Sequence, residues 1–181
     1  MQANLQRQLK SQKKLQKGLL HLMIQKPLND ITITELAEVS HVSRWAFYNN
    51  FDYVEEILVK YCDDLFISFY QDPICHEKRI NWDQFSLYIC RFAKDNAYFI
   101  RLLYENDKEL LFFRAAVLQT HKFFSESFNL QTTDEKILFL TGGIMALVSD
   151  WINSENKLNN RELAKIIKPQ VKLILTTDSR I

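Results

Sequence analysis

Glycine and proline are scarce in this sequence, with 3 residues of each among 181. Average composition would give roughly 13 glycines and 9 prolines in a chain of this length. β-Sandwiches and barrels need these residues in their many tight turns, and phosphate-binding loops need glycine where the backbone approaches the ligand. The shortage comes close to excluding those fold classes and favours an all-helical (all-α) protein.

Cysteine is too scarce and too irregularly spaced for a disulfide-stapled or metal-bound fold. Cys62, Cys75 and Cys90 cannot all pair within one chain, and their spacing matches no zinc motif. Cys75 and His76 are adjacent potential ligands, but no further ligands accompany them. We expect ordinary buried or half-buried thiols, no metal site and no cofactor.

Long apolar runs are missing as well. The N-terminal segment interleaves Lys and Gln with Leu, unlike a secretory signal, and no stretch approaches the ~20 apolar residues of a membrane helix. We therefore expect a soluble, reduced, cytoplasmic protein that makes no membrane contact.

Apolar residues make up 47% of the chain, including 13 Phe, 7 Tyr and 3 Trp, and they recur at helical spacing almost throughout. This periodicity predicts a first helix from about Leu5 to Met23, and a fourth helix that opens at the pair Asp52 and Glu55 and runs toward Pro73. Between them it predicts two short helices, Ile33–Ser40 and Ser43–Asn50. Further helices are predicted near residues 81–94, 97–106, 108–128, 133–153 and 160–176, and Asn159 with Glu162 gives a start signal for the last of them.

Charge is distributed unevenly although the net charge is only +1. Residues 1–51 hold seven basic and three acidic side chains, a net charge of +4, and the remainder carries −3. No acidic residue precedes Asp30. A basic N-terminal region suggests a polyanionic partner, although a solvated basic helix face would give the same pattern.

Two short helices joined by a tight turn are typical of a helix-turn-helix unit, whose second helix fits the major groove of DNA. Thr32 and Glu35 form a capping box, and Ser43 is placed to cap the following helix. Ala37 is small enough for the two helices to cross closely, and Val42 fills the turn. The other apolar side chains supply a small core: Ile31, Leu36, Phe47 and Phe51.

The segments Ile31-Thr32-Ile33-Thr34-Glu35-Leu36-Ala37 and Val42-Ser43-Arg44-Trp45-Ala46-Phe47-Tyr48-Asn49-Asn50-Phe51 resemble the DNA-binding head of TetR-type (TetR/AcrR) transcriptional regulators. The resemblance is strong over roughly residues 10–60 and weaker in Gly142-Gly143-Ile144, Trp151-Ile152 and the final amphipathic helix. It implies about nine helices, with a helix-turn-helix DNA-binding domain at residues 1–52 and a helical regulatory and dimerisation domain at residues 53–181.

The resemblance also implies which residues contact DNA. Candidates for base or phosphate contacts are Thr32, Thr34, Ser43, Arg44, Trp45, Ala46, Tyr48, Asn49 and Asn50, whereas Lys13 and Lys14 are expected to steer the protein toward DNA. For Arg44 a base contact is favoured over a phosphate contact, because arginine paired with guanine is the commonest specific contact. Tyr48 has a packing role as its alternative.

Three positions depart from the family pattern. His41 stands where a turn glycine is usual, so a positive φ there should cost on the order of 1 kcal/mol relative to glycine. Val54 replaces a common phosphate-binding lysine. Trp45 replaces a frequent glycine, and its ring either contacts the DNA groove or packs back on the first helix.

A single head reads few base pairs, so we expect a homodimer bound to double-stranded DNA at a palindromic operator. Gly142 and Gly143 would weaken an isolated helix by roughly 1 kcal/mol each, which close approach of another helix would offset. The expected dimer interface comprises Gly142, Gly143, Leu147, Trp151, Ile166, Ile167 and Ile174.

The C-terminal region is rich in large side chains that can line an effector pocket, although for any single one of them a plain core role is the favoured interpretation. The candidates are Trp82, Phe85, Tyr88, Tyr104, His121 and Phe124. If a ligand binds, the resemblance implies that it shifts the fourth helix and thereby the spacing of the two heads.

We therefore expect a dimeric, sequence-specific DNA-binding regulator whose C-terminal region senses an unknown small-molecule effector. Repression is the first expectation. The alternative is a regulator controlled by a protein coactivator, which predicts a filled interior and an exposed apolar patch. An enzyme using Cys75, His76 or His121 is not expected, since no nucleophile–base spacing supports it.

Overall fold

The computed structural model describes residues 2–77, 81–128, 134–154 and 158–176. Over these residues the chain is entirely helical, as predicted, with nine α-helices and two short 3-10 helices. In chain order they are α1 (Gln2–Met23), η1 (Leu28–Asp30), α2 (Ile33–Val39), α3 (Arg44–Tyr48), α4 (Val54–Tyr70), η2 (Pro73–His76), α5 (Trp82–Asp95), α6 (Ala97–Glu105), α7 (Glu109–Phe128), α8 (Asp134–Asn153) and α9 (Asn160–Thr176).

The helix bounds agree with the predicted ranges to within a few residues, and several predicted start signals are present as hydrogen bonds. The Thr32 hydroxyl accepts the Glu35 N–H at 3.2 Å, and the Ser43 hydroxyl accepts the Ala46 N–H at 3.1 Å. At α9, Asn159 Oδ1 accepts the Glu162 N–H while the Glu162 carboxylate accepts the Asn159 N–H. Each cap satisfies a backbone donor that the first helical turn leaves unpaired.

The start of α4 differs from the prediction that Asp52 and Glu55 open it. The residue that precedes the helix is Tyr53, which makes no side-chain cap bond. The Asp52 N–H instead donates to the carboxylate of Glu56 at 2.7 Å, one residue beyond the predicted partner. The predicted partner, Glu55, is engaged elsewhere because it forms an ion pair with Lys108 at 2.7 Å.

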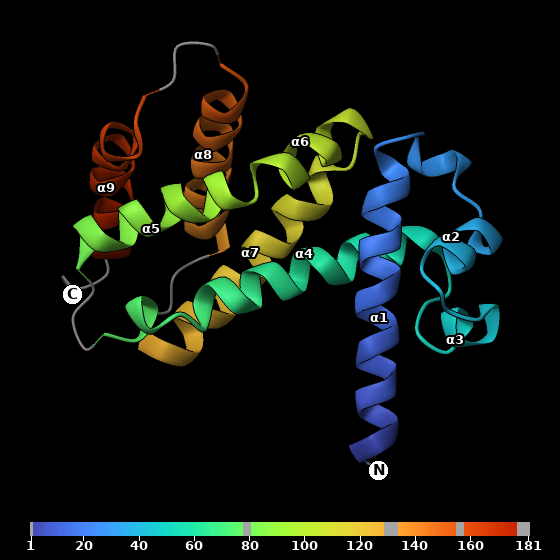
Figure 1. The fold of residues 1–181 in the computed structure, drawn as a ribbon. Coiled ribbons are helices and arrows are strands. Elements are labelled where there is room, and N and C mark those ends of the chain that lie inside the picture. Colours follow the sequence, from blue (N-terminus) through green and yellow to red (C-terminus); the bar gives the residue numbers. More distant parts are fainter. Residues whose placement is uncertain (1, 78–80, 129–133, 155–157, 177–181) are drawn as a thin grey trace.

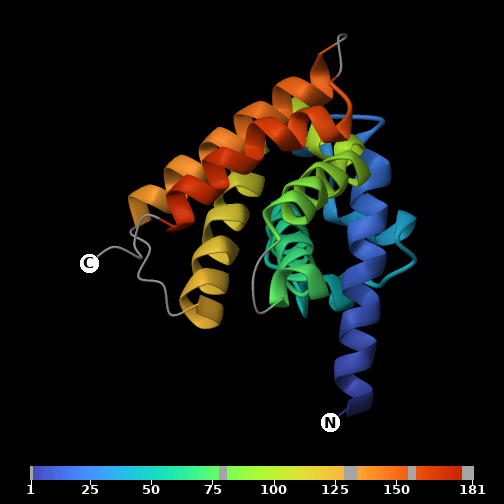
Figure 2. The ribbon, with the colours of Figure 1, turned by 90° about the vertical axis from the view of Figure 1, so that its left-hand side faces the viewer.

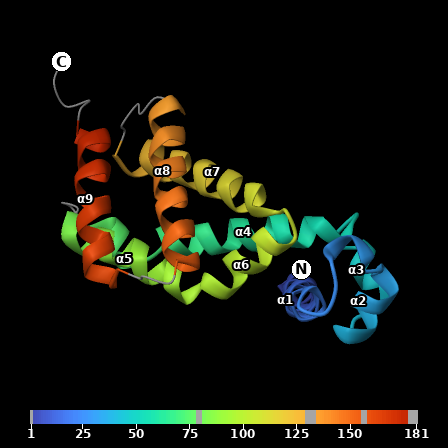
Figure 3. The same cartoon turned by 90° about the horizontal axis from the view of Figure 1, so that it is seen from above.

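Two regions can be distinguished, which we call the head (α1, η1, α2, α3) and the body (α5 to α9), with α4 running from one to the other (Figure 1). In the head, α2 and α3 pack on the C-terminal half of α1, whose N-terminal turns project past them. In the body, α4 lies along α7 and α5 lies along α9. Helices α8 and α9 lie side by side at the end of the body farthest from the head (Figures 2 and 3).

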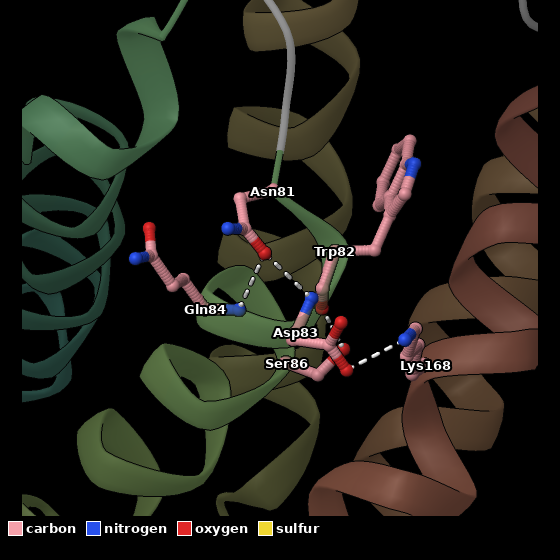
Figure 4. A network of polar contacts seen from close by, with 6 residues as sticks. All are labelled: Asn81, Trp82, Asp83, Gln84, Ser86 and Lys168. Atoms are coloured by element: carbon pink, nitrogen blue, oxygen red, sulfur yellow. Dashed lines mark hydrogen bonds and ion pairs between the residues drawn. The ribbon is translucent and has the colours of Figure 1, made fainter.

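The body helices are also joined by polar contacts at their ends. Figure 4 shows the start of α5, where Asn81 Oδ1 accepts the N–H groups of Asp83 and Gln84 at 3.2 and 3.3 Å. The Asp83 carboxylate pairs with Lys168 of α9 at 2.6 Å. This cap and ion pair fix the first turn of α5 against α9.

Asn106 and Lys108 tie the turn between α6 and α7 to the head side of the molecule. Asn106 Oδ1 accepts the N–H of Leu28 at 2.8 Å, while the Asn106 amide is held in place by donating to the Leu102 carbonyl at 2.9 Å. Lys108 in the same turn holds Glu55 in the first turn of α4. Asp107 between them has φ 56°, the left-handed conformation that reverses the chain after α6. None of the described helices is both long and apolar enough to cross a membrane.

Candidate functional site

The turn between α2 and α3 is held by backbone hydrogen bonds. The Val42 N–H donates to the Ala37 carbonyl at 3.0 Å, and the His41 N–H donates to Glu38 at 3.1 Å. His41 has φ 50°, so the positive φ predicted at this position of the turn is confirmed. Lys14 of α1 donates to the His41 carbonyl at 3.4 Å, which links the turn to the first helix.

A close approach of α1 to the end of α2 sets the position of this turn. Gly18 is buried, and a Cβ added there would lie 2.1 Å from Ser40 Oγ and 3.2 Å from Ser40 Cβ. Only glycine allows this distance, because the clash involves a buried neighbour. The close approach at Gly18 was not predicted from the sequence. The available signal was a glycine within the run of α1 leucines, between Leu15 and Leu19.

The side chains predicted to form the head core are buried, and α1 and α4 add to them. Phe47 has no exposed surface, and its ring packs 6.2 Å from that of Phe51. Val42 is half-buried against the same cluster. The remaining members come from every head element and from the start of α4: Leu15, Leu19, Leu22, Leu28, Ile31, Leu36, Ile57 and Leu58. This core fixes which face of α3 points outward.

The outward face of α3, together with the residue that ends the helix, carries four of the predicted DNA contacts. Arg44 and Asn49 are exposed, Trp45 is 76% exposed and Tyr48 is 52% exposed. A ring so exposed does not pack on α1, which excludes that alternative for Trp45, and its contact with a DNA groove stays a prediction. Tyr48 keeps an edge contact with Phe47 at 5.4 Å while half of its surface faces solvent.

Other predicted contact residues are engaged within the head. Thr32 and Ser43 act as helix caps, and Ala46 is half-buried. The third helix is shorter than predicted and ends at Tyr48, so Asn50 lies beyond it. The Asn50 amide turns back to donate to the Ala46 carbonyl, which corrects the expectation of an outward contact at this residue. Thr34 is exposed on α2.

The basic residues of α1 line its exposed surface. Lys13 and Lys14 are both exposed, and Lys14 donates a hydrogen bond to the His41 carbonyl. Lys13 forms no ion pair with any described residue. Val54, the predicted departure from a phosphate-binding lysine, is half-buried against the core and offers no charge.

The body contains a partly open cavity of about 80 Å³ that is lined mainly by α4, α5, α7 and α8. Its walls are almost entirely apolar, and α4 contributes Phe66 and Phe69 to them. The polar lining residues are Thr141 and the pair Tyr70 and Thr120, whose hydroxyl oxygens lie 2.6 Å apart. Burial raises the pKa of the Tyr70 phenol, so it stays protonated.

Two of the six predicted effector-pocket residues line this cavity, Phe85 and Phe124. The other four do not. Trp82 packs edge-on against Phe85 at 6.4 Å, and Tyr88 stacks on Phe69 at 4.6 Å from outside the cavity. Tyr104 is exposed at the end of α6.

His121, the sixth predicted pocket residue, lies on a different surface. It lines an open groove of about 460 Å³ between α7 and α8, which we call the α7–α8 groove. The groove is formed by Phe113, Arg114, Val117, Leu118, His121, Ile137 and Leu138. Sequence periodicity missed both this groove and the cavity walls of α4, since it assigns residues to a buried face but does not show where that face is incompletely filled.

The predicted dimer residues divide between the outside and the inside of the protomer. Gly143, Leu147 and Ile166 are exposed, and Gly142 is half-buried. Ile167 has no exposed surface, and Trp151 is buried with its indole N–H donating to the Leu158 carbonyl at 2.5 Å.

Trp151 and Ile167 therefore belong to the protomer core, which corrects the expectation that they lie at an interface. Consecutive helical residues point about 100° apart, so Ile166 faces out while Ile167 faces in. The side chain of Ile174 lies outside the described residues.

All three cysteines are buried free thiols, as expected. Burial raises the pKa of Cys62 and Cys75 to about 12 and that of Cys90 to about 11. The Cys75 thiol also donates to the Phe69 carbonyl at 3.5 Å. A nucleophilic cysteine needs a thiolate, so these thiols are unreactive at neutral pH. No group of three or more His, Cys, Asp or Glu side chains converges within the part of the chain that the structure describes.

Comparison with known proteins agrees with this architecture. The family model described as the transcriptional regulator C-terminal region of the TetR type matches residues 80–172, about half of the chain. No curated protein matches the sequence significantly. The chain belongs to the TetR family of transcriptional regulators.

Solved structures share the fold at low sequence identity. Lin0861 from Listeria innocua is 18% identical, with a TM-score of 0.77 over 93% of this chain and 92% of that one. A TetR transcriptional regulator from Streptococcus agalactiae is 17% identical, with a TM-score of 0.65 over 94% and 98%. The dihydroxyacetone kinase operon activator DhaS is 19% identical, with a TM-score of 0.58 over 91% and 94%.

Proposed function

We propose that this regulator is a homodimer whose two heads bind the half-sites of a palindromic DNA operator. The observation that carries the proposal is the outward face of α3, where Arg44, Trp45 and Tyr48 are exposed around the buried Phe47. A tryptophan ring left in water contributes little to folding, and a groove of DNA would bury it against sugars and thymine methyl groups.

The proposed contacts follow from the chemistry of each exposed group. Arg44 presents a planar guanidinium suited to guanine O6 and N7, and the Tyr48 hydroxyl is suited to a phosphate oxygen. Thr32 and Ser43 accept backbone N–H groups as caps, and each hydroxyl still has its own proton to donate to a phosphate. The Asn50 amide is engaged with Ala46, so Asn49 is the better candidate of the two.

Dimerisation is proposed through α8 and α9, which lie side by side at the end of the body (Figure 2). Leu147 of α8 and Ile166 of α9 are exposed there, and Gly143 leaves room for close approach. A two-fold pair would hold its recognition helices about 34–36 Å apart, one turn of the duplex. The proposal assigns no enzymatic activity.

Selection of bound duplexes from a random library by the purified protein tests the proposal. The expected product is a palindrome with half-sites about 10 base pairs apart. Arg44→Ala should weaken operator binding by about 1–3 kcal/mol and relax the preference at one position of each half-site. A selected pool without symmetry would contradict the palindromic operator. An unchanged base preference in the Arg44→Ala variant would contradict the base contact of Arg44.

Lys13→Ala is the matched control for Arg44→Ala, because Lys13 is an exposed cation on α1 that pairs with none of the residues the structure describes. It should weaken binding to all sequences alike and lower the slope of log affinity against log salt by about 1 per phosphate contact. Lys14 is a less clean control, since it also supports the turn through the His41 carbonyl.

The body cavity supports control by a small apolar effector. At about 80 Å³ it is well below the ~300 Å³ at which typical ligand pockets begin, so a larger effector has to expand it. Since Phe66 and Phe69 of α4 form part of its wall, expansion would displace α4 and with it the head. A benzene-sized aromatic probe that raises the unfolding midpoint would favour this form of control.

Control by a protein coactivator is the second candidate. The small cavity and the exposed apolar side chains of the body favour it, including Leu110, Leu118, Leu138 and Phe139. One structurally similar protein is an operon activator, so activation stands beside repression as an outcome of DNA binding.

A further inference from the structure

The outward face of α8 is apolar over most of its length. Its exposed positions between Glu135 and Asp150 carry no charge and comprise Leu138, Phe139, Gly143, Ala146 and Leu147. Phe139 is 76% exposed, as exposed as Trp45. The proposed operator accounts for Trp45, but nothing in the described protomer covers the Phe139 ring.

The glycines of α8 point to a surface outside the protomer. A Cβ added at Gly143 would meet no atom within 4 Å, and one added at Gly142 would meet only Phe113 at an ordinary 3.8 Å. Gly18, by contrast, is required by Ser40 within the same chain. The cost of two adjacent glycines in the middle of a helix is therefore not offset within the protomer, which is expected where another helix approaches closely.

The α7–α8 groove lies beside this face. Leu138 lines the groove, and the neighbouring residue Phe139 projects into solvent. In a two-fold dimer both copies contribute the same surface. A residue that projects from one copy must therefore fit a site that the same surface of the other copy provides. A projecting phenylalanine beside an apolar groove meets this requirement.

We propose that a second copy of this chain occupies the α7–α8 groove, with Phe139 of each copy inserted between α7 and α8 of the other. This inference rests on the proposed homodimer and extends its interface beyond α8 and α9 onto α7. The ring enters among Phe113, Val117 and Leu118 of the partner subunit. The groove and the ring are then covered by the same contact.

Charge supports the same arrangement. Glu135 is exposed one helical turn before Phe139, and Arg114 is exposed on the groove. Neither side chain forms an ion pair with any described residue of the protomer. With Phe139 inserted in the groove, Glu135 lies one helical turn from the ring, at the edge of the contact. Its carboxylate then forms an ion pair with Arg114 of the partner subunit at the rim of the desolvated interface.

Phe139→Ala tests the inference by the monomer–dimer equilibrium of the full chain in sedimentation experiments. The dimer dissociation constant should rise at least ~30-fold, as for an aromatic anchor in a partner's pocket. Tyr53→Ala is the matched control, since it removes another exposed aromatic ring, 57% exposed at the head end of α4, and should leave dimerisation unchanged. Helical circular dichroism confirms folding, because Phe139 is outside the core.

A charge-reversal cycle tests the orientation of the two copies. Glu135→Arg and Arg114→Glu should each weaken the dimer ~2- to 5-fold, and the double variant should recover most of the loss. Additive losses in the double variant would overturn the pairing. Leu118→Glu, on the groove side, should weaken the dimer as strongly as Phe139→Ala.

The outcomes separate this inference from the proposed function. If the wild type dimerises and binds a palindrome but Phe139→Ala and Leu118→Glu dimerise equally well, the inference is wrong and the proposed function stands. In that case the groove is open to another protein. If the wild type is monomeric at ~10 μM and binds no palindromic duplex, both fail.

Discussion

The head and the body use aromatic residues in opposite ways. In the head, the five-residue helix α3 places Phe47 fully inside and exposes Trp45 and Tyr48, so neighbouring rings have separate tasks. In the body, long helices bury ring upon ring, and Phe66, Phe69 and Phe112 are at once the core and the wall of the cavity.

This difference explains why function is easier to assign in one region than in the other. An exposed Arg or Trp on a short capped helix has no structural task, so its type indicates a partner. A buried phenylalanine is accounted for by packing alone, and it gains a second role only where packing is incomplete. A binding site built into a core is therefore not recognisable from residue types.

The largest expected effect separates the two tasks within α3. Phe47→Ala should lower the free energy of unfolding by about 3–5 kcal/mol, because it removes a ring with no exposed surface. Trp45→Ala should change stability by no more than about 0.5 kcal/mol while weakening DNA binding. Chemical denaturation and operator titration of both variants measure this contrast. A strongly destabilised Trp45→Ala would show that the ring is part of the head core after all.

The next effect compares glycines of the head and the body. Gly18→Ala should cost about 1–3 kcal/mol, because the new Cβ overlaps the Ser40 hydroxyl. Ser40→Ala should restore part of the loss in the double variant, since that hydroxyl has no hydrogen-bond partner among the described residues.

Gly143→Ala is the matched body variant. It should raise protomer helix stability by up to about 1 kcal/mol, because the space beside it is empty. Equal costs at Gly18 and Gly143 in denaturation measurements at low protein concentration would remove the distinction between the two regions.

The smallest effect concerns the turn of the head. His41→Gly should stabilise the protein by up to about 1 kcal/mol, because glycine adopts φ 50° without a Cβ penalty. The Lys14 contact is kept, since it is made to the backbone carbonyl. His41→Ala is the control and should not stabilise. A gain for alanine equal to that for glycine would mean that the imidazole, rather than the backbone, is responsible.

The sequence predicted the helices, the caps at Thr32, Ser43 and Asn159, and the inward and outward faces of α3, because these depend on local spacing and on hydrogen bonds a few residues apart. It did not predict that Trp151 and Ile167 lie inside the protomer. Periodicity defines an apolar face of a helix but not whether that face meets another helix of the same chain or a second copy.

Contacts distant in sequence were also out of reach. Gly18 meets Ser40 across two helices, and Tyr88 lies behind Phe69 rather than in the cavity, although both lie on predicted apolar faces. The boundary placed after residue 52 stays a prediction, since Ile57 and Leu58 of α4 complete the head core.

The ties from the turn at Asn106–Lys108 have a consequence for engineering. Leu28 and Glu55 are held by residues that follow them by some fifty to eighty positions. Asn106 accepts a backbone N–H that any residue except proline supplies, but exchanging the segment through the start of α4 would leave Lys108 unpaired wherever the relative lacks an acidic residue at position 55. A chimeric regulator with a new operator preference should therefore be grafted together with the matching α6–α7 turn. Grafts that omit this turn should still bind DNA, but changes in the body of the recipient protein should no longer alter that binding.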